Sequence, residues 1–195
     1  MKYGRLIYVM GPSGAGKDSV MAFARAASDP TRVTFAHRYI TRPPSGDAEN
    51  HIALTEAEFA ARQRAGWFAL SWQSHGLSYG IGSEIDLWLA SGISVVVNGS
   101  RAYFAEAVRG YPDLLPVLIT AAPEVRRARL LKRNRESASQ MIERLHRRIE
   151  TLPNHPGLAT INNSGELSLA GTRLLDLLHA RPPEEIEQAA SGRNR

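Results

Sequence analysis

Residues 11–19 read Gly11-Pro12-Ser13-Gly14-Ala15-Gly16-Lys17-Asp18-Ser19, and they directly follow the apolar run Leu6-Ile7-Tyr8-Val9-Met10. This is the pattern G-x-x-x-x-G-K at the end of an expected strand. Its glycines let successive backbone N–H groups surround phosphate oxygens, while the lysine adds a positive charge and the next helix offers its N-terminus. The sequence therefore predicts a loop, residues 11–19, that binds the phosphates of a nucleoside triphosphate such as ATP.

The last position of this pattern is unusual in the chain. Asp18 stands where a serine or threonine hydroxyl normally meets Mg²⁺, and a hydroxyl follows one residue later at Ser19. A carboxylate can ligate the metal directly or through water, because Mg²⁺ favours oxygen ligands. We expect Asp18 and Ser19 to hold Mg²⁺ together with ATP.

Length and composition limit the class of protein. A chain of 195 residues with 43% hydrophobic residues fits one domain with a small inserted lobe. It contains 0 cysteines, which excludes disulfides, thiol nucleophiles and zinc–thiolate sites. The start lacks the layout of a signal peptide, and no run approaches the ~18 apolar residues of a membrane span. We expect a soluble cytoplasmic protein with no membrane partner.

The positive charge of the chain comes mainly from arginine. Lysine and arginine total 24 against 19 acidic residues, and lysine occurs only at Lys2, Lys17 and Lys132. The planar arginine side chain suits bidentate binding of phosphate. Nucleic acid is the rival explanation for the charge, but no ladder of aromatic and basic residues is present. The composition favours a small phosphorylated substrate over nucleic acid.

Apolar β-rich runs alternate with helical patterns along the chain, which predicts a parallel sheet flanked by helices. The expected strands are residues 6–10, 33–36, 93–97, 115–120 and 159–161. The expected helices are residues 17–27, 55–65, 83–90, 101–109, 123–132, 137–151 and 166–179. The fold class is therefore α/β, of the P-loop NTPase type.

Residues 38–82 are expected to form the inserted lobe that binds the acceptor. Its helix begins with a capping box at Thr55, and two short antiparallel strands, residues 67–72 and 77–81, flank Ser74-His75-Gly76. One domain is expected over residues 1–180, with an arginine-rich lid at 133–148 and a loosely ordered tail at 181–195. The three tryptophans are expected to lie in the core, at Trp67, Trp72 and Trp88.

Four further motifs, taken in order, give the chain a resemblance to a known family. They are Thr41-Arg42-Pro43-Pro44, the stretch from His75 to Gly80, the arginine-rich stretch Arg133-Asn134-Arg135-Glu136 leading to Arg144, and Ile161-Asn162-Asn163. The arrangement resembles the guanylate kinase family and, within it, the ribose 1,5-bisphosphate phosphokinases of phosphonate catabolism. The resemblance covers residues 5–178.

The resemblance implies roles for several residues. It places the catalytic charges at Lys17, Arg133, Arg135 and Arg144, and the adenine contact at Asn162 and Asn163. It places acceptor binding at Arg38, Arg42, His51, Gln73, Tyr79, Asn98 and Arg101. Gln73 and Asn98 stand where guanylate kinases carry acidic side chains that bind guanine. A neutral amide lacks the strength of a carboxylate toward N–H donors, so guanine recognition is disfavoured.

By resemblance the reaction is ATP plus ribose 1,5-bisphosphate giving ADP and 5-phosphoribosyl 1-diphosphate. The nucleophile would be a phosphate oxygen, already deprotonated near neutral pH, so no general base is required. The sequence leaves two alternatives open: a nucleoside monophosphate kinase of the guanylate type, and a noncatalytic interaction module with the same fold. The intact Gly16-Lys17 pair argues against the second, since a binding module needs no phosphate loop. The oligomeric state is not predicted.

Overall fold

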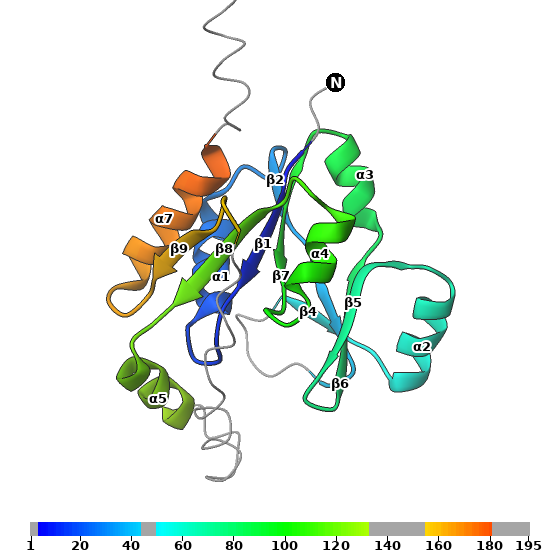
Figure 1. Cartoon of the computed structure of the whole chain (residues 1–195), viewed down its shortest axis with the longest axis horizontal. Helices are drawn as coiled ribbons and strands as arrows, with labels where there is room; N and C mark the ends of the chain where they lie inside the picture. The colour runs from blue at the N-terminus through cyan, green and yellow to red at the C-terminus, as the bar shows by residue number, and fades with distance from the viewer. Residues whose placement is uncertain (1–3, 44–49, 133–154, 181–195) are drawn as a thin grey trace, which may run out of the picture.

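A computed structural model of the chain describes residues 4–43, 50–132 and 155–180. Five strands form a parallel sheet in the order β2-β7-β1-β8-β9, and the connections between them run through helices (Figure 1). The strands are β1 (Leu6–Met10), β2 (Val33–Phe35), β7 (Ser94–Asn98), β8 (Leu115–Thr120) and β9 (Ala159–Asn162). The predicted α/β class and the five core strands are confirmed.

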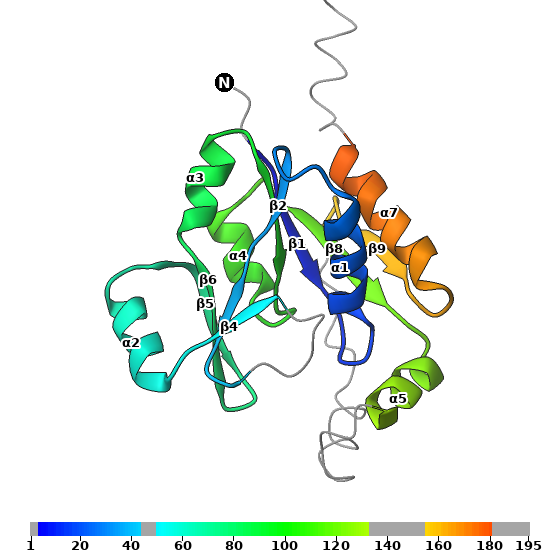
Figure 2. The ribbon, with the colours of Figure 1, turned by 180° about the vertical axis from the view of Figure 1, so that it is seen from behind.

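Helices cover both faces of this sheet, and each face has its own apolar cluster. On one face α1 (Lys17–Ala27) and α7 (Leu167–His179) pack side by side over Ile7, Val9 and Ile119 (Figure 2). On the other face α3 (Glu84–Ala90) and α4 (Phe104–Gly110) cover Tyr8 and neighbouring side chains. Because the central strand β1 is buried on both faces, it is apolar throughout, as parallel strands usually are.

A second, four-stranded sheet lies within residues 38–82, the segment predicted to form the lobe. Its order is β4-β3-β6-β5, and helix α2 (Glu56–Arg64) packs against it (Figure 1). The capping box of α2 is present, since the Thr55 hydroxyl accepts from the Glu58 N–H and the Glu58 carboxylate accepts from the Thr55 N–H. The hairpin β5 (Phe68–Ser74) and β6 (Leu77–Gly82) matches the expected antiparallel pair. The strands β3 (Arg38–Ile40) and β4 (His51–Ala53) were not predicted.

Two of the three tryptophans expected in the core pack against it, and the third does not. Trp72 and Trp88 pack against the cluster under α3 and α4, but Trp67 is 58% exposed at the start of β5. The guanidinium of Arg62 lies over the Trp67 ring, 5.9 Å from its centroid. A cation above the ring lets this indole stay at the surface, so the prediction for Trp67 is wrong.

The turn after β7 is fixed to β1 by one buried phenol. The Tyr8 hydroxyl donates to the Ser100 carbonyl at 2.8 Å and accepts from the Ser100 N–H at 2.9 Å. Burial raises the pKa of Tyr8 well above its ordinary value, so the phenol stays protonated at neutral pH. This clamp holds the carboxyl ends of β1 and β7 together, where ligands bind in open α/β sheets.

Within the described ranges, no helix combines the length and the apolar character that a membrane span requires. The predicted lid at 133–148, the helix expected at 137–151 and the predicted tail at 181–195 lie outside the described residues. Helix α5 (Pro123–Lys132) agrees with its predicted bounds and leads up to the first of these segments (Figure 1).

Candidate active site

The loop between β1 and α1 has the backbone of a phosphate cradle. Gly14 and Gly16 take φ angles of 78° and 83°, in the left-handed region that favours glycine. A Cβ on Gly16 would run into the side-chain amide of Asn163, and one on Gly14 would lie 2.9 Å from the Arg126 carbonyl oxygen. Only glycine keeps this loop open, and that fits a loop whose N–H groups approach a ligand closely.

Lys17, the first residue of α1, folds back over this loop. Its Nζ donates to the Gly11 carbonyl oxygen at 2.9 Å, and the side chain is half-buried. The ammonium group is therefore held above the loop backbone rather than directed into solvent. A positive charge in this place, at the N-terminus of a helix, can stabilise phosphate oxygens bound in the loop.

Two arginines of α5, Arg126 and Arg129, support the loop from the side. Arg126 Nε donates to the Ser13 carbonyl oxygen at 3.0 Å, and Arg129 Nη1 donates to the Ala15 carbonyl oxygen at 3.5 Å. Neither was predicted as a site residue, although their spacing of three on an expected helix was a signal that they share one face. Burial lowers the pKa of Arg126, and the nearby charge of Arg101 lowers it further. Arginine remains a cation at neutral pH, so both add positive charge beside the loop.

Asn162 and Asn163, predicted to contact adenine, have different positions after β9. Asn163 is only 1% exposed, and its Nδ2 donates to the Ala15 carbonyl oxygen at 2.8 Å. Asn162 is exposed, and its Oδ1 accepts from the N–H and the hydroxyl of Ser164. Asn163 thus anchors the phosphate loop, a contact that was not predicted, and its adenine contact stays a prediction. For Asn162 the adenine contact stays a prediction.

We expect Asn163→Ala to loosen the loop. The change removes a buried donor from the Ala15 carbonyl and leaves a small cavity, so the free energy of unfolding should fall by about 1–3 kcal/mol. The KM for ATP should rise by about 10-fold as the loop loses its fixed shape. Denaturant titration and steady-state kinetics measure the two effects.

Asn162→Ala is the matched comparison for that prediction, since Asn162 is its exposed neighbour with local contacts to Ser164. Asn162→Ala should lower the free energy of unfolding by less than about 1 kcal/mol. An equal loss of stability in the two variants would contradict the anchoring role of Asn163.

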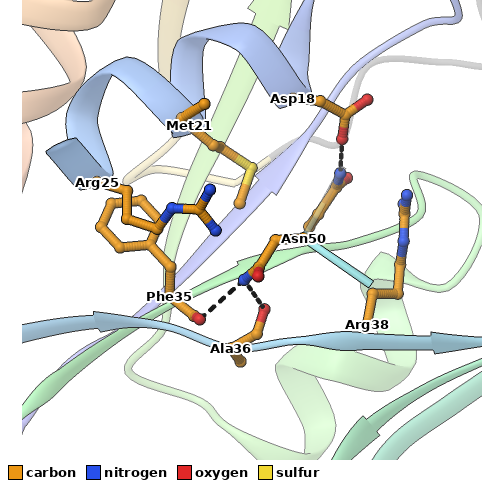
Figure 3. Close-up of a pocket in the computed structure, with 9 residues that line it drawn as sticks. Asp18, Met21, Arg25, Phe35, Ala36, Arg38 and Asn50 are labelled. Atoms are coloured by element: carbon orange, nitrogen blue, oxygen red, sulfur yellow. Dashed lines mark hydrogen bonds between the residues drawn. The ribbon is translucent and has the colours of Figure 1, made fainter. Parts of the chain in front are cut away.

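Asp18 and Asn98 meet at the carboxyl ends of β1 and β7. Asn98 Nδ2 donates to Asp18 Oδ1 at 2.7 Å, although 80 positions separate the two residues (Figure 3). Asn98 is buried and ends β7, next to β1. Asn98 was predicted to bind acceptor and Asp18 to bind metal, but their contact with each other was not expected. Ser19, the other predicted metal ligand, is half-buried on the next position of α1.

The lobe contributes Arg38, which is stacked on a column of aromatic rings. Its guanidinium lies over Tyr79 at 5.6 Å from the ring centroid, and Tyr79 stacks on Trp72 with an angle of 4° between the planes. Trp72 in turn stacks on Tyr103, which precedes α4. The column joins the lobe to the core and fixes the guanidinium beside the phosphate loop. The structure therefore brings together Arg38 and Tyr79, two of the residues predicted to bind the acceptor, and the binding itself stays a prediction.

The other predicted acceptor residues are less uniformly placed. His51 lies beside Arg38 in the parallel pair β3–β4, and Arg42 is half-buried, with Nη1 donating to the Pro43 carbonyl oxygen at 3.0 Å. Arg101 is half-buried on the turn after β7, near Arg126 of α5. Arg133, Arg135 and Arg144, predicted as catalytic, lie outside the described residues.

Gln73 is not brought together with this group. In β5 it pairs with Ser78, whereas the preceding Trp72 pairs with Tyr79. Side chains alternate between the two faces of a sheet, so Gln73 lies on the face opposite to Trp72, Tyr79 and Arg38. It is exposed, and the structure does not support its predicted role in acceptor binding.

One cavity of about 140 Å³ joins the phosphate loop to the lobe. It is lined by Ser13, Gly14, Gly16, Lys17, Asp18, Arg38, Asn98 and Leu130. The open glycine cradle and the cation of Lys17 fit nucleotide phosphates, and the Asp18 carboxylate fits Mg²⁺. Among the described residues there is no group of three or more His, Cys, Asp or Glu side chains that could hold a metal. A single carboxylate is still adequate, because Mg²⁺ in kinases is held largely by substrate phosphates and water.

These features define a P-loop kinase with a guanylate kinase-like arrangement. Comparison with solved structures agrees, since guanylate kinase from Anaplasma phagocytophilum superimposes with a TM-score of 0.59 at 16% identity, covering 91% of this chain and 86% of that one. Identity at this level shows the fold alone. No protein-family model matches the chain.

Sequence comparison narrows the class further. The chain is 53% identical over 180 residues to ribose 1,5-bisphosphate phosphokinase PhnN of Thiobacillus denitrificans, covering 91% of this chain and 94% of the relative. It is 50% identical over 192 residues to the protein of the same name from Desulfomicrobium baculatum, covering 97% and 98%. The chain belongs to the ribose 1,5-bisphosphate phosphokinase family.

Proposed function

We propose that this chain transfers the γ-phosphoryl group of ATP to the 1-phosphate of ribose 1,5-bisphosphate, giving ADP and 5-phosphoribosyl 1-diphosphate. The observation that carries the proposal is the shared cavity, which Lys17 of the phosphate loop and Arg38 of the lobe line together. Such a cavity lies between the two elements that would bind the two substrates, and it can hold phosphate groups that face each other. The names of the relatives at about 50% identity support the same reaction.

The chemistry requires two polyanions to approach in line. An oxygen of the 1-phosphate forms a bond to the γ-phosphorus, and the bond from that phosphorus to the bridging oxygen breaks, its electron pair leaving with ADP. The attacking oxygen is already deprotonated near neutral pH, so no side chain has to remove a proton. The enzyme contributes position and positive charge.

We assign these tasks to named groups. Lys17 and the loop N–H groups hold the ATP phosphates, with Arg126 and Arg129 bracing the loop. Arg38, Arg42 and Tyr79 hold the acceptor from the lobe. Mg²⁺, which Asp18 and Ser19 would hold, supplies further positive charge that screens the two phosphates. Arg133, Arg135 and Arg144 are proposed to add charge from the segment outside the described residues.

The test is a coupled assay of ADP release with ATP and Mg²⁺. Ribose 1,5-bisphosphate, GMP and AMP are offered as acceptors in parallel, and the product is identified by mass spectrometry. We expect turnover with the sugar bisphosphate and formation of 5-phosphoribosyl 1-diphosphate. Preferential turnover of GMP or AMP would replace the proposal with a nucleoside monophosphate kinase, and binding without turnover of any acceptor would favour an interaction module.

Arg42→Ala should separate the two substrates kinetically. Arg42 lies in the lobe and not in the phosphate loop, so its loss should raise the KM for ribose 1,5-bisphosphate by about 10- to 100-fold, the worth of a charge-assisted hydrogen bond. The KM for ATP should change less than about 2-fold, because the loop is untouched.

The matched control is Arg64→Ala, which removes an exposed arginine from the last turn of α2 in the same lobe. Its kinetic constants should stay close to those of the unmodified chain. A larger rise in the KM for ATP than for the acceptor in Arg42→Ala would move Arg42 out of the acceptor site.

The proposed partner is thus a small phosphorylated sugar, and the proposed location is the cytoplasm. Nucleic acid has no part in the proposal.

A further inference from the structure

Two polar atoms that border the cavity of the phosphate loop are fully buried, and within residues 4–43, 50–132 and 155–180 neither has a hydrogen-bond partner. They are Asn98 Oδ1, an acceptor, and Arg38 Nε, a donor. Asn163 Oδ1 is likewise buried without a partner in these ranges, but it does not line that cavity. Asn98 as a whole is 7% exposed. A buried polar group without a partner is destabilising, so native proteins rarely leave one unpaired. The pair therefore indicates a ligand that supplies the missing partners.

The orientation of the Asn98 amide is set by its neighbour. Its Nδ2 donates to Asp18 Oδ1 at 2.7 Å. A carboxylate can only accept hydrogen bonds, so the amide nitrogen must face Asp18 and the amide oxygen must point away from it. Asn98 Oδ1 is consequently an acceptor with a fixed direction. The guanidinium of Arg38 is likewise fixed by its stacking on Tyr79.

Both side chains border the same two cavities. One is the cavity of about 140 Å³ that the phosphate loop lines. The other is a smaller cavity of about 20 Å³, with polar lining from Asp18, Arg25, Arg38, Asn50 and Asn98 and apolar lining from Met21, Ala22, Phe35 and Ala36 (Figure 3). A cavity needs about 10–15 Å³ to hold one water-sized group. The smaller space is thus large enough for a single hydroxyl, and too small for a phosphate group or a sugar ring.

The acceptor Asn98 Oδ1 and the donor Arg38 Nε limit which chemical group can occupy the smaller cavity. A phosphate oxygen at neutral pH has no proton to donate to Asn98 Oδ1. A metal cation cannot accept a hydrogen bond from Arg38 Nε. A hydroxyl group accepts from Arg38 Nε and donates to Asn98 Oδ1 at the same time.

We propose that Asn98 and Arg38 bind the 2-hydroxyl of the ribose in the acceptor and make the enzyme specific for ribose over deoxyribose. This rests on the function proposed above. The 1-phosphate has to lie in the larger cavity, where the phosphoryl group arrives, and the next ring carbon carries the 2-hydroxyl. The 2-hydroxyl is therefore the sugar hydroxyl closest to the 1-phosphate, and the smaller cavity shares Asp18, Arg38 and Asn98 with the larger one.

The expected consequence is selectivity for the hydroxylated sugar. A site built to hydrogen-bond a hydroxyl rejects the analogue that lacks it, because its own buried groups are then left unpaired. We expect kcat/KM to be about 100-fold lower for 2-deoxyribose 1,5-bisphosphate than for ribose 1,5-bisphosphate. The 3-deoxy analogue should lose less than about 10-fold.

The test compares the two sugars in the unmodified chain and in Asn98→Ala. This substitution also releases the Asp18 carboxylate, so it lowers activity toward both sugars, but that loss cancels in the ratio of their kcat/KM values. The ratio should fall from about 100 to below about 5. Arg38→Lys keeps the positive charge and removes Nε, so it should lower the ratio as well and serves if Asn98→Ala fails to fold. Gln73→Ala, which removes an exposed amide from the far face of the lobe, should keep the ratio.

The outcomes are distinct. Equal turnover of both sugars by the unmodified chain would overturn the proposal. An unchanged ratio in both Asn98→Ala and Arg38→Lys would also overturn it, and would assign the smaller cavity to a bound water. A chain that releases no ADP with ribose 1,5-bisphosphate at all would refute the proposed function itself, which is a different result.

Discussion

Replacing Lys17 with alanine is expected to lower kcat/KM for ATP by about 1,000-fold, the upper range for the loss of one electrostatic group that stabilises transferred charge. The ammonium lies over the loop backbone, with Nζ 2.9 Å from the Gly11 carbonyl oxygen, and lines the cavity shared with the lobe. The other basic residue of α1 is Arg25 in its last turn, about two helical turns away from the loop, so it cannot take the place of the Lys17 ammonium. The initial rate of ADP release measures the effect.

The fold should survive this change. Lys17 is half-buried and contributes a hydrogen bond to a loop carbonyl, so the melting temperature should shift by less than about 5 °C. Arg173→Ala is the matched control, since it removes an exposed positive charge from α7 on the far part of the core. It should retain activity within about 2-fold. Full turnover by purified, folded Lys17→Ala would refute the assignment of the phosphate loop.

The parts of the fold that were predictable are those that local sequence determines. The run from Leu6 to Met10 is apolar at every position because β1 is buried on both faces. Helix α1 begins at Lys17 because Gly16 just before it takes left-handed angles, which a right-handed helix does not contain. Helix α5 and strand β8 also have the predicted bounds, because the sequence within each segment determines them. The strands β3 and β4, with three residues each, are too short to show a period of two.

The site was less predictable because its contacts join distant segments. The hydrogen bond between Asn98 and Asp18 forms because β1 and β7 are neighbours in the sheet. No local sequence pattern predicts which strands are neighbours. Arg126 and Arg129 support the loop because α5 lies beside it, and an arginine-rich helix alone is equally typical of a solvated surface. Gln73 lies on the other face of the lobe from Arg38 and Tyr79 for a related reason, because a resemblance gives a place in the chain and not a face of a strand.

The Asp18 carboxylate provides the second large effect that we expect. Asp18→Ala should raise the Mg²⁺ concentration for half-maximal activity by about 10- to 100-fold, as is typical when a group that holds a metal or orients its ligands is lost. Asn98 keeps the carboxylate in place through its 2.7 Å hydrogen bond, so the oxygen atoms face the cavity that Lys17 also lines. The measurement is a Mg²⁺ titration of ADP release at a fixed, saturating ATP concentration.

Asp18→Ser provides the sharper comparison, because it supplies the hydroxyl that this position usually carries in phosphate loops. A hydroxyl is a neutral oxygen ligand, so Asp18→Ser should need less Mg²⁺ than Asp18→Ala and more than the unmodified chain. Asp176→Ser removes an exposed carboxylate from α7 and controls for the change in overall charge. It should not change the Mg²⁺ concentration for half-maximal activity. If Asp18→Ala loses activity with an unaltered Mg²⁺ requirement, the carboxylate does not serve the metal. Its work would then be to hold the Asn98 amide, and the selectivity between ribose and deoxyribose should fall in Asp18→Ala as it does in Asn98→Ala.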